Sequence, residues 1–148
     1  MNNEIVKEKN LLFEEDVRLT EVREFGFSWH DFATENRTIP PQGLQFEIHF
    51  EGEVNGEELQ GRIKGVDYLT VRSDKRLFLN LHATITTDDG ALIKVVENGI
   101  NDRGALQLNM DFHTNDDRYT WLNHKHVWGV GTVDFATGKV KIKGYQNQ

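Results

Sequence analysis

Residues 65–93 read GVDYLTVRSDKRLFLNLHATITTDDGALI, and this stretch decides the fold. Between 77 and 86, apolar and polar side chains alternate, which gives a β-strand one apolar face and one mostly polar face. Turn signals flank this strand, with Ser-Asp-Lys at 73–75 and Asp-Gly at 89–90, where glycine adopts positive φ without steric cost. The stretch therefore predicts two antiparallel strands and the beginning of a third. The apolar positions are Leu77, Leu79, Leu81, Ala83 and Ile85.

The same alternation recurs on both sides of this stretch. Residues 44–51 and 105–113 alternate without a break, and Asn-Gly pairs at 55–56 and 98–99 are further hairpin signals. Eight to ten short strands predict an all-β fold. A single antiparallel β-barrel is preferred because closure removes exposed strand edges, although the periodicity also fits a sandwich. The remaining strands are expected within 19–30, 57–64, 91–97, 125–135 and 139–145.

The other segments carry weaker signals. Residues 1–18 are expected to be peripheral, with a frayed start followed by a helical turn or edge strand at 11–18. A loop is expected over 30–43, because two adjacent prolines cannot lie inside a helix. One short helix is expected near 117–124, where an aspartate can cap its N-terminus.

Composition narrows the class of protein. The 148 residues predict one domain spanning 1–148, and the absence of cysteine excludes disulfides and thiolate chemistry. The formal net charge of −7 argues against nucleic acid or an anionic membrane as the main partner. No apolar run approaches ~18 residues, and the first ten residues lack the apolar core of a signal peptide. We therefore expect a soluble, cytoplasmic protein; association into a homo-oligomer stays open.

Three motifs lie far apart in the chain: Gly65-Val66-Asp67-Tyr68 with Arg72, Thr87-Asp88-Asp89-Gly90-Ala91, and Tyr119-Thr120-Trp121-Leu122-Asn123. In order and spacing they resemble the bacterial and fungal family known as domain of unknown function 3237, over about residues 43–145. The resemblance implies a closed antiparallel barrel similar to allene-oxide-cyclase-like, calycin-like and dirigent-like barrels, and it implies no established reaction. The chain departs from the family pattern at His82, where arginine is usual, and at His113, where an acidic residue is usual.

The candidate ligand site combines the polar strand face with these motifs. Arg72 could hold a carboxylate or enolate, and His82 could carry a proton near neutral pH. Asp67 or Asp89 could act as a general base if buried, although Asp89 also suits a tight turn. The alternative is that the polar face meets solvent and the leucine face is the core. The predicted ligand-binding residues are Asp67, Tyr68, Arg72, His82, Thr84, Asp89, His113, Tyr119, Trp121 and Asn123.

Metal and cofactor signals are weak. His124 and His126 form a His-x-His, but no third ligand stands at a recognisable spacing, so no metal is predicted. No phosphate-binding loop or Gly-x-Ser-x-Gly motif occurs, and no cofactor is expected. Two functions stay open: a barrel that binds a small aromatic or enolic molecule in its interior, and a cofactor-free isomerase, cyclase or lyase acting on such a molecule.

Overall fold

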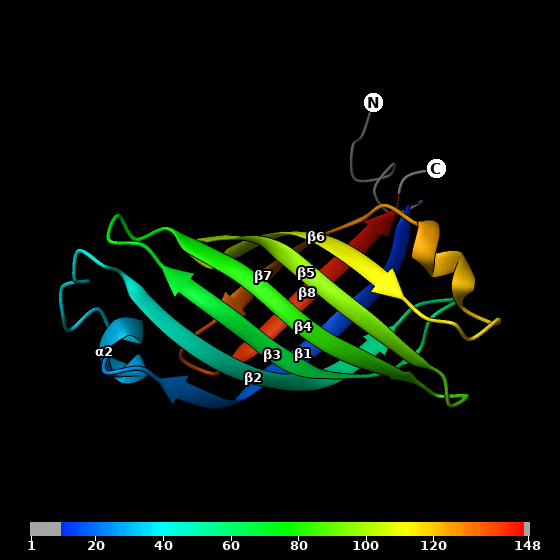
Figure 1. The fold of residues 1–148 in the computed structure, drawn as a ribbon, viewed down its shortest axis with the longest axis horizontal. Coiled ribbons are helices and arrows are strands. Elements are labelled where there is room, and N and C mark those ends of the chain that lie inside the picture. Colours follow the sequence, from blue (N-terminus) through cyan, green and yellow to red (C-terminus); the bar gives the residue numbers. More distant parts are fainter. Residues whose placement is uncertain (1–9, 147–148) are drawn as a thin grey trace.

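The computed structural model describes residues 10–146 and shows eight antiparallel strands closed into a barrel (Figure 1). Each strand pairs with the next in sequence, and the last pairs with the first. The predicted all-β antiparallel barrel is thus confirmed. The strands are β1 (Leu11–Glu24), β2 (Leu44–Asn55), β3 (Gly61–Val71), β4 (Leu77–Thr87), β5 (Leu92–Asp102), β6 (Ala105–His113), β7 (Val127–Asp134) and β8 (Lys139–Gln146).

The first strand corrects the prediction for the start of the chain. β1 is neither a helical turn nor an edge strand, because it pairs with β2 on one side and β8 on the other. It closes the barrel, so residues 11–18 are central to the fold rather than peripheral. The predicted frayed start falls on residues 1–9, which lie outside the described residues.

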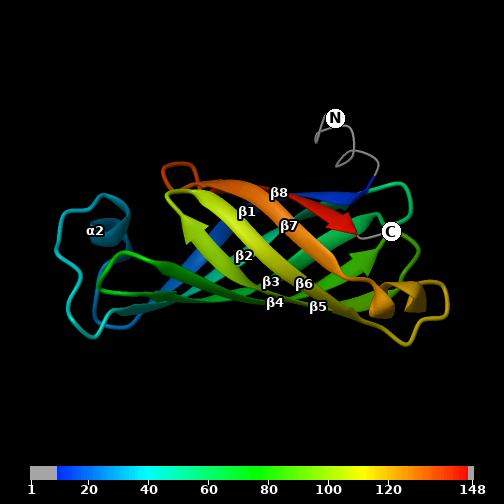
Figure 2. The same ribbon diagram turned by 90° about the horizontal axis from the view of Figure 1, so that it is seen from above.

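In the described part of the chain, two short helices lie at opposite ends of the barrel (Figures 1 and 2). The 3-10 helix η1 (Thr120–His124) confirms the short helix predicted near 117–124. The helix α2 (Trp29–Ala33) was missed, because its five residues are too few to show a helical period. Its N-terminus is capped by Ser28, whose Oγ accepts a hydrogen bond from the Asp31 N–H at 3.1 Å. Among the described residues, no helix has the length and apolar character needed to cross a membrane.

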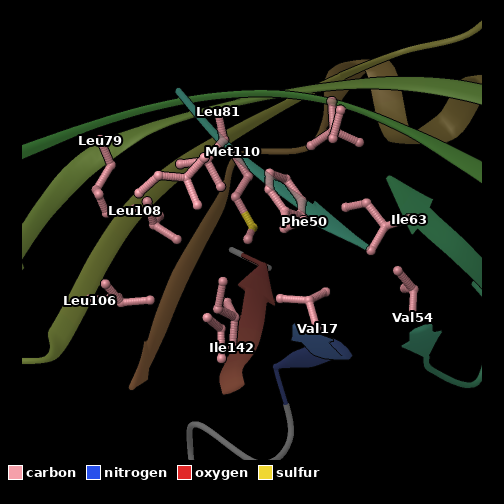
Figure 3. Packing of buried hydrophobic residues seen from close by; sticks show 14 of the residues in the cluster. Val17, Phe50, Val54, Ile63, Leu79, Leu81, Leu106, Leu108, Met110 and Ile142 are labelled. Atoms are coloured by element: carbon pink, nitrogen blue, oxygen red, sulfur yellow. The ribbon is translucent and has the colours of Figure 1, made fainter. Parts of the chain in front are cut away.

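The leucine face of β4 points into the barrel. Leu79 and Leu81 pack there against Phe50, Met110 and other side chains from neighbouring strands (Figure 3). Because side chains alternate along a strand, the intervening residues of β4 lie on the outer wall. The apolar face is therefore the barrel core, which was the alternative that the sequence left open.

Several inward positions are held by glycine because the strands approach closely there. A Cβ at Gly65 would meet the backbone of His82 and Ala83, and one at Gly99 would meet the backbone of Gln107. Each lies two residues from a buried acid on the same strand, Asp67 on β3 and Glu97 on β5. The backbone is thus tightly packed beside both carboxyl groups.

Candidate functional site

The end of the barrel that carries α2 opens into a large cavity, here called the mouth. Its volume is about 1190 Å³, and three segments line most of it, namely 32–39, 73–78 and 100–104. Val133 and Phe135, at the end of β7 and just beyond it, complete the wall.

One side of the mouth is aromatic. Trp29 and Phe32 of α2 pack on each other with ring centroids 5.4 Å apart, and Trp29 lies edge-on to Phe46 at 5.1 Å. Phe135 completes the group, with its ring 5.4 Å from Trp29 and 6.2 Å from Phe32. α2 is therefore fixed by ring contacts, and Phe32 and Phe135 face the mouth.

A second cavity lies deeper in the barrel and is called here the inner cavity. Its volume is about 60 Å³, and it shares Asn101, Val133 and Phe135 with the mouth. Three polar residues line it: Glu15, Asp67 and Asn101. The two cavities thus meet at a common wall, and the inner one is apolar except for two acids and an amide. Its apolar lining includes Val17, Phe50, Leu79, Leu81, Leu106, Leu108 and Ile142 (Figure 3).

Among the described residues, three carboxyl groups are buried inside the barrel. Glu15 is 2% exposed, Asp67 8% and Glu97 0%. Within residues 10–146, Oε2 of Glu15 and both carboxyl oxygens of Glu97 lack a hydrogen-bond partner. Buried polar atoms are nearly always hydrogen-bonded, so these unpaired oxygens need an explanation beyond the fold.

Asp67 is held by the backbone of the neighbouring strand. Its Oδ1 accepts a hydrogen bond from the Asn80 N–H at 3.0 Å. The β3–β4 ladder is interrupted between the Asp67–Leu81 and Thr70–Phe78 pairs, and Asn80 lies inside this gap. The local opening of the sheet therefore supplies the donor that orients the carboxyl group.

The three carboxyl groups differ in their protonation. Burial raises the pKa of Asp67 to about 6, although the Asn80 N–H opposes this rise. Burial raises the pKa of Glu15 to about 8. The pKa of Glu97 is raised well above its usual range, first by burial and then by the negative charges of Glu15 and Asp67. At pH 7, Asp67 is mostly ionised and Glu15 mostly protonated.

The opposite end of the barrel is closed by a polar network around Asp89. Tyr119 Oη donates to the Asp89 carboxylate at 2.9 Å, and Thr87 Oγ1 donates to it at 2.5 Å. Arg118 Nη1 lies 3.4 Å from the same carboxylate. The hydrogen bonds from Thr87 and Tyr119 lower the pKa of Asp89. The network fastens η1, whose Leu122 is fully buried, to the β4–β5 turn.

Asn123 serves the same closure. Its Oδ1 accepts from the Thr114 N–H at 2.9 Å, and its Nδ2 donates to the Thr114 carbonyl at 2.8 Å. Trp121 Nε1 donates to the Arg118 carbonyl at 3.1 Å, inside the same segment. The Tyr-x-Trp-Leu-Asn motif therefore seals one end of the barrel.

The ten predicted ligand-binding residues do not surround one cavity, and this expectation is corrected. Asp67 alone among them lines the inner cavity. Arg72 is exposed beside the β3–β4 turn, with Nε 3.7 Å from Asp74 Oδ2. Strand alternation explains the division on β3: Asp67 points into the barrel, so its neighbour Tyr68 must point outward. The outer wall carries Tyr68, His82, Thr84 and His113, and the η1 end carries Asp89, Tyr119, Trp121 and Asn123.

Glu15 and Glu97 were missed from the sequence, yet a signal for both exists. Glu15 alternates in phase with Phe13 and Val17, and Glu97 with Ile93 and Val95. An acid in the apolar phase of a strand predicts a buried carboxyl group. Asn101 and Phe135 carry no comparable signal, because their role depends on where the strands end.

A metal centre would require several ligating side chains close together in the described part of the chain. No group of three or more His, Asp or Glu side chains there has the arrangement of a metal site.

Comparison with known proteins gives a family model and several solved structures. The model described as "Protein of unknown function (DUF3237)" matches residues 37–147. No curated protein matches the chain. A beta-barrel like protein from Acinetobacter baumannii AYE is 24% identical, with 93% of each chain covered and a TM-score of 0.73.

Two further structures are similar in the same way. A conserved protein of unknown function from Rhodopseudomonas palustris is 22% identical, covering 93% of this chain and 95% of that one, with a TM-score of 0.74. A protein from Penicillium herquei described as an enzyme is 20% identical, covering 91% of each chain, with a TM-score of 0.65. At these identities the similarity establishes the barrel fold.

Proposed function

Because the chain belongs to the DUF3237 family of proteins of unknown function, we propose a function from its own cavities: it binds a small organic molecule. The molecule enters at the mouth, and its polar group reaches the inner carboxyl groups. The carrying observation is that the mouth and the inner cavity share a wall, behind which acidic oxygens are buried without partners.

The unpaired oxygens support a bound ligand because they are costly in the free protein. A buried polar group without a hydrogen bond costs about 1–3 kcal/mol. Glu15 Oε2 lacks a partner in the part of the chain that the structure describes, and Glu15 lines the inner cavity. A ligand with a hydroxyl or carbonyl group would satisfy such an atom and recover part of this cost.

The shape of the site supports an aromatic ligand with one small polar group. Ligand pockets usually measure about 300–1,000 Å³, so the mouth can hold a drug-sized body. The inner cavity, at about 60 Å³, has room only for a small functional group. Ring contacts with Phe32 and Phe135 would each contribute about 0.5–1.5 kcal/mol beyond the burial of area.

The experiment measures binding of 2-naphthol and 2-tetralone, two bicyclic aromatic probes with one oxygen each, by saturation-transfer NMR at about 1 mM. Val133 lines both cavities, so Val133→Trp should obstruct the way from the mouth to the inner cavity and weaken binding at least tenfold. The matched control is Thr132→Trp, which points outward from the same strand and should leave binding unchanged. Absence of binding by both probes, or equal weakening by both variants, would overturn the proposal.

The enzymatic alternative is favoured by one observation: Asp67, oriented by the Asn80 N–H, and Glu15, whose Oε2 lacks a partner in the described chain, line the same cavity.

A further inference from the structure

We propose that the inner cavity moves a proton within the bound molecule, with Asp67 as general base and Glu15 as general acid on an enolisable carbonyl compound. This inference rests on the proposed function, because the molecule must first bind there. It names the substrate class as aromatic ketones that have a C–H bond next to the carbonyl.

The strands bring these acids to one cavity from different parts of the wall. Asp67 projects from β3 and Glu15 from β1, and both line the same 60 Å³ space. Glu97 lies near Asp67, since the register pairs Asp67 with Leu81 and Leu81 with Glu97. A ketone group in this space would therefore lie against two carboxyl groups, those of Glu15 and Asp67.

The titratable groups among the described residues that line the inner cavity are the carboxyl groups of Glu15 and Asp67. Among the described residues that line the inner cavity, none is Lys, Arg or His. Asn101 also faces it, but its Oδ1 already accepts from the Gly104 N–H at 2.7 Å. Proton transfer in this cavity must therefore use the carboxyl groups of Glu15 and Asp67, with Glu97 as the other acid nearby.

The surroundings assign opposite roles to the two acids. The Asn80 N–H stabilises the ionised form of Asp67, whereas Oε2 of Glu15 is buried without a partner in the described chain. Their pKa values, about 6 and about 8, leave a base and an acid together near neutral pH. Burial, and then the negative charges of Glu15 and Asp67, raise the pKa of Glu97 well above its usual range, which favours its neutral form.

The step balances without a cofactor or oxidant. The Asp67 carboxylate takes the proton from the carbon next to the carbonyl, and the C–H electron pair forms a C=C bond. The carbonyl π electrons move to oxygen, which takes the proton of Glu15. The product is the enol, with Asp67 protonated and Glu15 ionised. Return of a proton from Asp67 to carbon and of the enol proton to Glu15 restores both groups.

The test follows hydrogen–deuterium exchange at C1 of 2-tetralone in D₂O by proton NMR, using the full chain. The wild-type protein should accelerate exchange over buffer, with a maximum between pH 6 and 8. Asp67→Asn should lower the protein-dependent rate at least a hundredfold while 2-tetralone still binds, and Glu15→Gln should lower it similarly. The matched controls are Asp111→Asn and Glu14→Gln. Asp111 is exposed on β6 and Glu14 is exposed on β1, so both variants should keep the wild-type exchange rate.

Two outcomes separate this inference from the proposed function. Binding of 2-tetralone without accelerated exchange would overturn the proton transfer and leave binding intact. Absence of binding by both probes would remove the proposed function itself. Circular dichroism establishes that each variant is folded, and if one variant does not fold, the other carries the test through its own rate.

Discussion

Replacing Glu15 with glutamine should remove a large part of the pH dependence of the protein's stability. In the wild type, the folded state holds the Glu15 proton more tightly than the unfolded chain, because burial raises its pKa from 4.5 to about 8. Stability from this group is therefore fully present below about pH 4.5. It is lost as the pH rises toward about 8. Glutamine has nearly the same shape and no charge to lose.

The magnitude follows from the two pKa values. The difference between the Glu15 pKa values of the folded and unfolded states costs the folded state about 1 kcal/mol at pH 5 and about 3 kcal/mol at pH 7. Glu15 should thus contribute a fall of about 2 kcal/mol to the free energy of unfolding of the wild type over this interval, in addition to the falls from Asp67 and Glu97, and Glu15→Gln should lose this contribution. Part of the rise in the Glu97 pKa comes from the charge of Glu15, so Glu15→Gln should also lower the pKa of Glu97.

The assay is urea denaturation at pH 5, 6 and 7, with the slope against urea checked for constancy. Glu14→Gln is the matched control, because Glu14 precedes Glu15 on β1 but is exposed and pairs with Lys143 at 3.7 Å. Its curve should run parallel to that of the wild type. A Glu15→Gln curve that also runs parallel would refute the reasoning, because the Glu15 carboxyl group would then titrate alike in both states.

Two further predictions concern the frame around the site. Tyr119→Phe removes the hydroxyl that donates to Asp89, so hydrogen exchange of the Leu122 and Lys125 amides should become several-fold faster while the amides of the barrel strands stay protected. Loss of protection throughout the barrel would contradict a local role for this hydroxyl. Gly99→Ala places a methyl group against the backbone of Gln107 and should lower the free energy of unfolding by about 3 kcal/mol or more, measured by thermal and urea unfolding. A nearly unchanged free energy of unfolding would contradict this prediction and show that β5 can shift away from Gln107.

The barrel was predictable because its signals are local. The alternation of apolar and polar residues in 77–86 shows directly in the order of the residues, because successive side chains of a strand point to opposite faces. The turns show through their glycine residues, which adopt conformations that other residues avoid. β1 was harder, because its inward Glu15 interrupts the apolar phase between Phe13 and Val17. α2 was missed because a five-residue helix held by aromatic contacts leaves no periodic pattern.

The candidate site was less predictable, since it depends on which strand face turns inward. The sequence interpretation looked for function on the polar face, yet that face of β4 is the outer wall. Asp67 was found through a motif, whereas Glu15 and Glu97 were hidden among apolar neighbours. A search for charged residues in the apolar phase of strands would have found both.

The contrast between the polar residues at the η1 end of the barrel and the acids Glu15 and Asp67 inside it supports a functional role for these two acids. Asp89 and Tyr119 contribute hydrogen bonds that close the barrel, so stability explains why they are there. Stability does not explain Glu15, because its burial costs about 3 kcal/mol at pH 7 in a protein whose net stability is expected to be about 5–15 kcal/mol. Glutamine at this position would fit the same space without that cost. An acid that lowers stability and lines a cavity beside Asp67 is therefore better explained by what the cavity binds.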